Sequence, residues 1–278
     1  WVYPLRRLIV ELTAKRKNLL KLVKAANTVA RATDERPIFR NLLLEADQDL
    51  YITVSDMVTG LRLRLANGEL LSVKSGGRAL LSALTFQRVV ESIPDAELNI
   101  TLRDNRLVVS GNKAKFELST EDARDFPPIR KFDVNGRFVQ LISTDFVNLL
   151  RRVVFFAHTD YSIHNMHGVL FKLKQDRLHI VGTNGQRLGV ASAQIKATIG
   201  YGADGPSESS IVPAKALEIF SKLPIEAELI DIQCGNKSIS VRSDAIELTI
   251  TTISGQYVPY ERGIPNNKKL LRIQRKRL

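Results

Sequence analysis

The sequence predicts an α+β fold made of two tandem copies of one unit, each with two helices packed on antiparallel sheets. Three observations lead to this prediction. With 44% hydrophobic and 25% charged residues, the composition of the 278 residues is that of a globular protein. Short motifs recur in one order about 130 residues apart. Each copy alternates helical and strand-like segments, and such helices bury their apolar side against one face of a sheet.

The repeat is visible in matching segments. Asn18–Lys21 recurs as Asn148–Arg151 after 130 residues. Glu91–Pro94 matches Phe220–Pro224, and each of these two segments ends a helical stretch and precedes an alternating apolar run. The matches predict the following domains: a first over residues 1–130, a second over 131–262, and a linker with the first strand of a truncated third over 263–278.

The first copy opens with a strand and a long helix. Alternating apolar residues predict a strand over 8–12. Apolar residues at helical spacing predict a helix over 14–29, and Thr13 is the expected N-cap. Period-two alternation between short polar turns predicts further strands at the end of this copy. Those strands cover residues 98–102, 106–110 and 115–120.

The second copy repeats this order. A strand is predicted over 138–142, and a helix follows it through Phe156 with Ser143 or Thr144 as the N-cap. Prolines, charges and an Asn-Gly pair interrupt both patterns over 127–136, where we place the boundary between the copies. The closing strands are predicted over 228–233, 237–242 and 245–251.

The formal net charge of +12 is concentrated at two places. Residues 1–24 carry seven basic residues and one acidic residue, and residues 266–278 carry six basic residues and no acidic one. The remainder carries 28 basic and 28 acidic residues and is neutral. A nucleic-acid partner must therefore be argued from the positions of basic residues, not from net charge.

Basic residues recur on the predicted helices. Lys17, Lys21 and Lys24 stand at i, i+4 and i+7 and form one stripe. Such a stripe is most often only a solvated helix face, but its recurrence in a repeat favours an extended surface for phosphates. No aromatic residues are interleaved with it, so base stacking is not indicated. The other helices contribute Arg88, Arg151, Arg152, Lys215 and Lys222.

Two motifs do not lead to a site. Gly200–Gly205 fits the pattern G-x-G-x-x-G, but Pro206–Ser210 follows it where a nucleotide-binding fold requires a helix, so we expect a loop between strands. His158, His164 and His167 lack the cysteine or carboxylate that would complete a zinc site. No catalytic constellation stands out, so we expect a protein that is not an enzyme and has no cofactor or metal.

Composition also bears on location. Cys234 is the single cysteine, so it cannot form an intramolecular disulfide. Residues 1–10 lack the apolar core of a secretory signal, and no run approaches the ~18 apolar residues of a membrane helix. We expect a cytoplasmic protein.

Several segments, taken together and in order, carry a resemblance to a known family. They are Pro37–Leu44, Leu107–Gly111, Phe116–Thr120, Asp125–Pro127, Gly182–Leu188, Ile211–Lys215 and Tyr257–Pro265. These segments resemble the bacterial DNA polymerase III beta subunits, the sliding clamps, and the resemblance covers essentially the whole chain. It implies the DNA clamp fold, in which three similar domains per subunit form a ring with helices around a central hole. It also implies a processivity factor of DNA replication that encircles duplex DNA and tethers the replicative polymerase during strand elongation.

The resemblance implies a set of DNA-binding residues. In the family a loop arginine contacts DNA, and Arg31 or Arg36 is nearest to its place, while Thr33 holds the aligned position. The loop after His158 approaches DNA in the family, which makes Tyr161 and His164 candidates. The implied inner-wall residues are Lys17, Lys21, Lys24, Arg88, Arg151, Arg152, Lys215 and Lys222.

The resemblance also implies partners: the DNA polymerase III catalytic subunit, the clamp loader and other proteins with a clamp-binding motif. These insert a peptide into an apolar cleft. Asn184–Gln186 replaces the usual Asp-Gly-His, and Gly263 stands where an apolar residue is common; an Asn-Gly turn also needs no partner. Phe116 and Leu118 are the expected subunit contacts of a homo-oligomeric ring. The implied cleft residues are Met166, Thr183, Gly185, Arg187, Leu188, Val258 and Arg262.

The length leaves alternatives open. Residues 268–275 resemble the opening strand of another unit, so most of a third domain is missing from the sequence. A trimer of two-domain subunits would supply the six units of a ring. The other hypotheses are a non-encircling interaction or regulatory protein that binds clamp-binding peptides through the second domain, and an incomplete clamp fragment.

Overall fold

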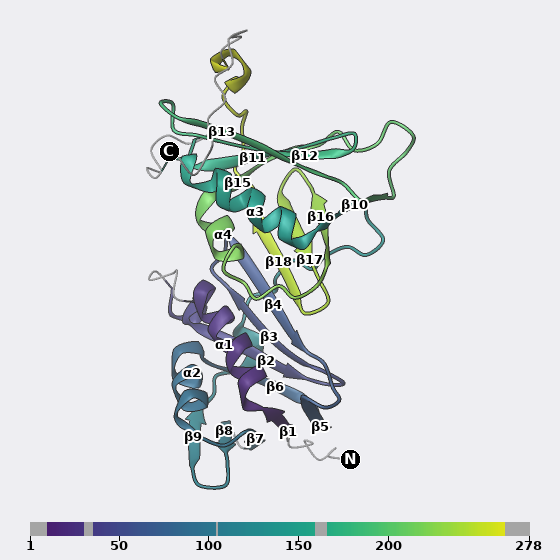
Figure 1. Cartoon of the computed structure of the whole chain (residues 1–278). Helices are drawn as coiled ribbons and strands as arrows, with labels where there is room; N and C mark the ends of the chain where they lie inside the picture. Colours follow the sequence, from purple (N-terminus) through teal and green to yellow (C-terminus); the bar gives the residue numbers. More distant parts are fainter. Residues whose placement is uncertain (1–9, 31–35, 104, 159–165, 265–278) are drawn as a thin grey trace, which may run out of the picture.

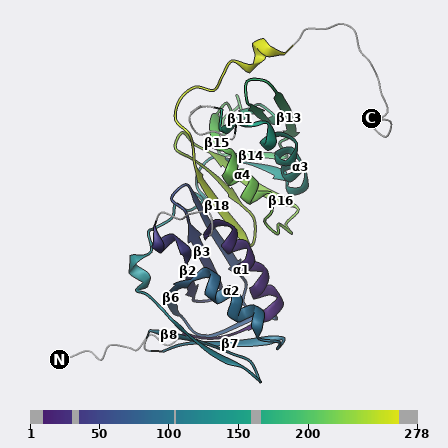
Figure 2. The same cartoon turned by 90° about the vertical axis from the view of Figure 1, so that its left-hand side faces the viewer.

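The computed structural model describes residues 10–30, 36–103, 105–158 and 166–264. These residues form three antiparallel sheets, with helices on one side of the largest sheet (Figures 1 and 2). The predicted α+β fold with two helices in each copy is confirmed. The helical segments are α1 (Arg16–Ala30), α2 (Ala83–Ser92), α3 (Ser143–Val153), α4 (Ala214–Phe220), and the 3₁₀ segments η1 (Pro37–Arg40), η2 (Ala123–Asp125), η3 (Val154–Phe156) and η4 (Tyr260–Gly263).

A five-stranded sheet belongs to the first copy. Its first strand in the sequence begins at Val10 and alternates buried and half-buried residues, as the sequence predicts for this region. The sheet order is β5, β1, β7, β8, β9, so β9 lies at an edge. The strands are β1 (Val10–Lys15), β5 (Leu71–Ser75), β7 (Glu97–Arg103), β8 (Arg106–Ser110) and β9 (Lys115–Ser119).

A nine-stranded sheet runs through both copies. Strands of the second copy continue directly into strands of the first, because Ile246 pairs with Leu63 and Ile250 with Thr59 along one antiparallel ladder. The division at residue 130 stays a prediction, since this sheet crosses it. In spatial order, the strands are β14 (Ala197–Ile199), β10 (Phe138–Ile142), β16 (Leu229–Cys234), β17 (Ser238–Arg242), β18 (Ile246–Thr251), β4 (Thr59–Leu65), β3 (Leu50–Ser55), β2 (Asn41–Ala46) and β6 (Gly77–Ser82).

A four-stranded sheet completes the second copy. Helix α3 packs against two of its strands, and Gly182 and Gly189 leave room there for Val153 and Phe156. In spatial order, the strands are β13 (Leu188–Gln194), β12 (Arg177–Thr183), β11 (Gly168–Lys174) and β15 (Ser209–Pro213).

The two faces of the nine-stranded sheet have different coverings. Alternate residues of β4 and β18, such as Leu61 and Leu248, belong to the main apolar core, which also includes the buried sides of the helices. Their neighbours, such as Gly60 and Thr249, therefore point to the opposite face. We call this opposite side the outer face. Both views place the four helices on the core side (Figures 1 and 2).

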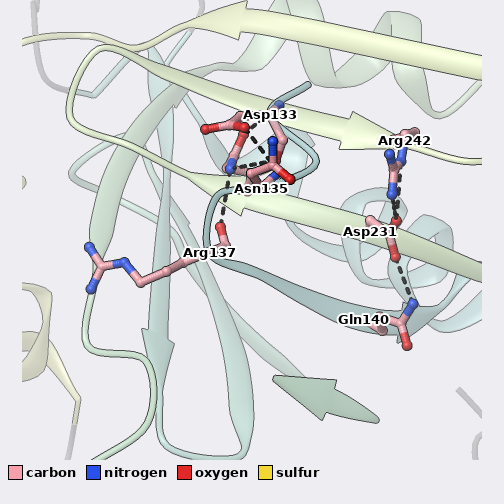
Figure 3. A network of polar contacts seen from close by, with 7 residues as sticks. Asp133, Asn135, Arg137, Gln140, Asp231 and Arg242 are labelled. Carbon is pink, nitrogen blue, oxygen red and sulfur yellow. Dashed lines mark hydrogen bonds and ion pairs between the residues drawn. The ribbon is translucent and has the colours of Figure 1, made fainter. Parts of the chain in front are cut away.

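The segment between the two copies crosses the outer face. Phe126 forms a small apolar cluster there with Leu43 and Leu80. Phe132 lies under the guanidinium of Arg242, whose Cζ is 4.3 Å from the ring centroid. The same Arg242 donates to Asp231 at 2.6 Å, and Gln140 donates to the other carboxylate oxygen at 2.8 Å (Figure 3). Apolar and polar contacts thus hold the connecting segment against the sheet.

Three local expectations are wrong. Thr13 lies inside β1, where its hydroxyl donates to Asn99 at 2.8 Å, so it does not cap α1. Ser143 is the first residue of α3, its hydroxyl donates to the carbonyl of Ala227, and no side chain caps this helix. Lys222 follows the end of α4 at Phe220. In the first two cases a partner from another strand or loop competed successfully with the local cap.

Leu61 tests the junction between the copies, because it is fully buried in β4 opposite Leu248 of β18. We expect Leu61→Ala to lower the free energy of unfolding by about 2–5 kcal/mol, through lost burial and the cavity left behind. Urea denaturation followed by circular dichroism measures the change. Val134→Ala is the control, because Val134 is 60% exposed and its truncation should change stability by less than about 0.5 kcal/mol. Equal losses in the two variants would contradict the packing described.

Candidate nucleic-acid interface and peptide cleft

Helix α1 has a buried face and a basic face. Leu19, Leu22 and Val23 pack into the core, while Lys17 and Lys24 are exposed and Lys21 is half-buried. Helical periodicity accounts for both faces, because residues three and four apart share one side of the helix. The structure therefore places the predicted lysine stripe on the solvent side of α1.

Two of the three lysines on this stripe have carboxylate partners. Lys21 forms an ion pair with Glu226, which lies beyond α4 in the second copy, and Lys24 lies 3.2 Å from Glu91 at the end of α2. Lys21 lowers the pKa of the Glu226 carboxyl group, mainly through its hydrogen bond and secondly through its positive charge. Within the described part of the chain, Lys17 has no ion pair.

The other helices add basic residues to the same side of the sheet. Arg88 is exposed on α2, and Arg151 and Arg152 are exposed near the end of α3. Arg151 donates to the carbonyl of Ser221 at 3.4 Å, which connects α3 with the residues after α4. Lys215 is exposed on α4. All four helices lie on one side of the nine-stranded sheet (Figure 2), and each of them carries at least one exposed cation.

The predicted loop residues are only partly described. Arg36 is exposed and directly precedes η1, which leads into β2. Arg31, Thr33, Tyr161 and His164 lie outside the described residues. Their predicted contacts with DNA stay predictions.

Phe155 is an exposed aromatic residue close to the basic residues of α3, and it was not predicted as a site residue. It follows Arg151 and Arg152 within one helical turn, is 60% exposed, and its ring centroid lies 4.2 Å from that of Phe156. A signal was present in the sequence. Val153–Phe156 is a continuous apolar run, and an amphipathic helical segment cannot bury four consecutive residues on one face.

The turn between β12 and β13 carries several predicted cleft residues. Thr183 accepts a hydrogen bond from the N–H of Gly185 at 3.1 Å and donates to the carbonyl of Arg187 at 2.8 Å. Asn184 accepts from the N–H groups of Gln186 and Arg187 at 3.1 and 2.8 Å. Gly185 has φ +87°, which is the left-handed region that favours glycine. The turn is thus stable without any partner.

An apolar surface adjoins this turn. Leu188 packs against a cluster formed by Leu170, Val181 and Ile211. Tyr257 also packs there, and its hydroxyl donates to the carbonyl of Val181 at 3.1 Å. Burial raises the pKa of the Tyr257 hydroxyl to about 12, so this donor keeps its proton at neutral pH.

A hollow of about 460 Å³ lies between this sheet and the segment 252–261. Val258 is the one predicted cleft residue among those that line it. Met166 lies near Gly185, since a Cβ added to Gly185 would be 3.8 Å from the Met166 sulfur. Arg187 and Arg262 are exposed. The structure thus brings together the turn residues with Met166, and it places Val258 in the hollow and Arg262 on the surface.

The floor of this apolar surface was not predicted from the sequence. Leu170, Val181, Ile211, Tyr257 and Tyr260 belong to it. Their signal is the apolar run Val169–Phe171 in β11, because successive strand residues point to opposite faces. Both faces of β11 must therefore be covered, one by the core and one by the segment that contains Tyr257.

Phe116 and Leu118 lie on β9 at the edge of the five-stranded sheet. Phe116 is 37% exposed. Glu117 lies 3.3 Å from both Arg106 and Lys115, and hydrogen bonds from Lys115 and then Arg106 lower the pKa of its carboxyl group. One side of β9 has no strand partner in the part of the chain described, so its backbone groups are available to another strand. A subunit contact at this edge stays a prediction.

The remaining observations concern the glycine-rich loop, groups of metal-ligating residues and membrane-spanning helices. Gly200–Gly205 lies between β14 and β15 with no helix after it until α4, so the predicted loop is confirmed. Within the described ranges, no three His, Cys, Asp or Glu side chains are grouped as a metal site would require. None of the described helices has the length and apolarity of a membrane span.

Known proteins of one family match this sequence over most of its length. The family model for the N-terminal domain of the DNA polymerase III beta subunit matches residues 10–130, and that for the central domain matches residues 140–259. The beta sliding clamp of Escherichia coli K12 is 28% identical over 262 residues, covering 93% of this chain and 69% of that protein. The beta sliding clamp of Caulobacter vibrioides is 26% identical over 272 residues, covering 94% and 70%.

Solved structures give the same fold. The DNA polymerase sliding clamp of Bacillus subtilis superimposes with a TM-score of 0.85 at 20% identity, over 93% of this chain and 68% of that one. A Pseudomonas aeruginosa sliding clamp bound to griselimycin has a TM-score of 0.81 at 23% identity, over 93% and 68%. The chain therefore belongs to the family of bacterial DNA polymerase III beta subunits, the sliding clamps, and corresponds to their N-terminal and central domains.

Proposed function

We propose that the chain acts as a processivity factor of DNA replication, a non-catalytic sliding clamp that surrounds duplex DNA and tethers a DNA polymerase. The observation that carries this proposal is the collection of exposed cations from four helices on one side of a continuous sheet. Such a surface attracts phosphates without reading bases. A cytoplasmic location follows from this role in bacteria.

The arrangement suits sliding. Contacts made by lysine and arginine to phosphate are equivalent at every step along a duplex, so no position is favoured over the next. The ion pairs of Lys21 and Lys24 reduce the positive field of α1. Weak attraction is sufficient if a closed ring, and not the strength of each contact, prevents dissociation.

Encirclement requires further copies of the chain or further domains. The free edge of β9, with Phe116 exposed on it, supports a contact in which a strand of a neighbouring subunit extends the five-stranded sheet. We propose that this edge closes the ring.

A second candidate function is a peptide-binding protein that does not surround DNA. It is favoured by the apolar surface at Leu188 and Tyr257, because the described residues of this chain alone form it. In the clamp proposal this surface receives peptides of the polymerase and the clamp loader. In the second proposal it is the only functional surface.

DNA binding by the helix surface can be tested with Lys17→Glu combined with Arg152→Glu, since both side chains are exposed and lack ion pairs within the described ranges. We measure the slope of log affinity against log salt concentration for a 24-base-pair duplex. We expect this slope to become shallower by roughly two, because the double variant loses two phosphate contacts and releases about two fewer counterions. Fluorescence anisotropy at several salt concentrations measures this slope.

The control for this pair is Lys113→Glu combined with Lys174→Glu. Lys113 lies in the turn between β8 and β9, and Lys174 is the last residue of β11. Both are exposed and neither is on a helix, and their reversal changes the net charge equally. An equal slope change in both double variants would argue against a helix-specific surface. A strict monomer by light scattering that is not retained on closed circular DNA would contradict encirclement and favour the second function.

The ion pair between Lys21 and Glu226 should restrain DNA binding. We expect Glu226→Gln to raise duplex affinity at low salt roughly two- to threefold, because it releases Lys21 and removes a repelling carboxylate. Glu218→Gln removes one exposed carboxylate of α4 as the matched control and should have a smaller effect. Adding Lys21→Gln to Glu226→Gln should cancel the part of the gain that comes from Lys21. A gain of undiminished size in this double variant would show that Lys21 does not contact DNA.

The peptide cleft can be tested through Leu188. Griselimycin serves as the probe, because a related clamp has been crystallised with it. We expect Leu188→Ala to weaken griselimycin binding about tenfold in isothermal titration calorimetry, since it removes apolar surface next to the Leu170 and Val181 cluster. Leu70→Ala is the control, because Leu70 is 40% exposed in the first copy. Unchanged affinity in Leu188→Ala would place the ligand elsewhere.

A further inference from the structure

A second hollow lies on the outer face, at the seam where β18 meets β4. Its volume is about 390 Å³, which is within the ~300–1,000 Å³ typical of ligand pockets. Its floor consists of small residues of both copies, such as Ser55, Gly60 and Thr249. We call it the junction pocket. It lies on the sheet face opposite the helices and belongs to neither of the surfaces discussed above.

The walls of the junction pocket are largely apolar. The turn between β3 and β4 contributes Met57 and Val58, which are 57% and 42% exposed. The connecting segment contributes Pro127, Pro128 and Ile129. Two neighbouring exposed apolar side chains at the rim of a hollow are the arrangement expected of a contact surface, whereas exposed apolar residues elsewhere in a protein are commonly single.

The charged residues of the lining are all basic. Arg130 and Lys237 line the pocket, and none of its lining residues is acidic. Arg130 donates to the hydroxyl of Ser238 at 2.7 Å, a neutral partner, so its charge is not compensated by that contact. Within the described residues, neither cation forms an ion pair. The pocket thus combines an apolar wall with two uncompensated positive charges.

The pocket has fixed walls. Thr249 donates to the carbonyl of Arg130 at 3.1 Å, and the N–H of Phe132 donates to the carboxylate of Glu247, so the connecting segment is bonded to β18 on one side of the hollow. On the other side, Asp56 accepts from the N–H groups of Val58 and Thr59 and orders the turn. A ligand would therefore enter a site that is already shaped, which lowers the entropic cost of binding.

We propose that the junction pocket binds a short acidic peptide of a partner protein, with one large apolar side chain seated between carboxylates. The apolar wall at Met57 and Val58 would receive the side chain, and Arg130 and Lys237 would bind the carboxylates. The basic segment 266–278 of this chain does not fit, because it carries six basic residues and no acidic one. The proposal goes beyond DNA tethering, since the helix surface stays accessible when the outer face is occupied.

The test uses the pentapeptide Asp-Glu-Trp-Glu-Asp, labelled with fluorescein, and anisotropy with the full chain. Two matched peptides separate the contributions: Asp-Glu-Ser-Glu-Asp lacks the apolar side chain, and Lys-Lys-Trp-Lys-Lys reverses the charge. We expect the acidic tryptophan peptide to bind at least about tenfold more tightly than either matched peptide. Equal binding of the serine peptide would reduce the effect to unspecific attraction by basic residues and would overturn the proposal.

Two variants locate the site. Arg130→Glu combined with Lys237→Glu should weaken the peptide about tenfold, while Lys113→Glu combined with Lys174→Glu, which changes the net charge equally, should not. Met57→Asn should weaken it severalfold without disturbing the turn, because asparagine tolerates the φ of +71° found at Met57. Leu70→Asn is its control. Unchanged binding in Met57→Asn and in the Arg130 and Lys237 double variant would overturn the proposal.

Two further outcomes identify other occupants. If the Arg130 and Lys237 double variant weakens a 24-base-pair duplex as much as the peptide, the site recognises phosphate and the proposal fails. If light scattering shows self-association that Met57→Asn abolishes, the occupant is a second copy of the chain and the proposal also fails. Retained DNA binding together with lost peptide binding supports the proposal, and its failure would leave the DNA proposal untouched.

Discussion

The backbone ladder between β18 and β4 is the contact on which the rest of the structure depends. It joins a strand of the second copy to a strand of the first, from Ile246 opposite Leu63 to Ile250 opposite Thr59. Backbone hydrogen bonds fix both the distance and the register of the two strands. The helices of the two copies consequently lie on one side of a single sheet, and each helix carries at least one exposed basic residue.

The same ladder explains why the outer face needs a covering. Leu43 and Leu80 point away from the main core, and they would be exposed without Phe126 of the connecting segment. That segment lies close to the sheet, because a Cβ at Gly60 would come within 3.1 Å of the Cβ of Ile129. Gly60 therefore permits the close approach of strand and connecting segment. The junction pocket is the place beside this contact where the covering ends.

Periodicity in the sequence predicted most strands and helices, because alternation and helical spacing follow directly from the burial of one face. Residues 138–142 form β10, with the bounds predicted from the sequence. The caps were wrong for a physical reason. Thr13 and Ser143 have the chemistry of N-caps, but Asn99 and Ala227, more than 80 residues away, provide their partners. Local sequence cannot reveal a competitor that only the tertiary fold brings near.

The exposed basic residues of the helices could be predicted from their spacing in the sequence, but their ion-pair partners could not. The exposure of Lys17, Lys21 and Lys24 follows from their positions on one helix face. That Lys21 pairs with Glu226 could not be read from the sequence, since 205 residues separate them. The floor of the peptide surface was missed because Leu170 resembles an ordinary core residue until the segment with Tyr257 is seen to cover it.

Ion pairs determine how much of the formal net charge acts at the helix surface. The formal charge of +12 describes the whole chain, but the potential at the helix surface depends on which cations keep a partner nearby. Lys21 and Lys24 face carboxylates, whereas Lys17 and Arg152 do not within the described residues. A surface on which carboxylates compensate part of the cations holds a phosphate backbone loosely and remains sensitive to salt. Glu226 belongs to the second copy and Lys21 to the first, so this ion pair connects the two copies. In the proposed clamp, the same ion pair would weaken the attraction of Lys21 for DNA, which would favour sliding over tight binding.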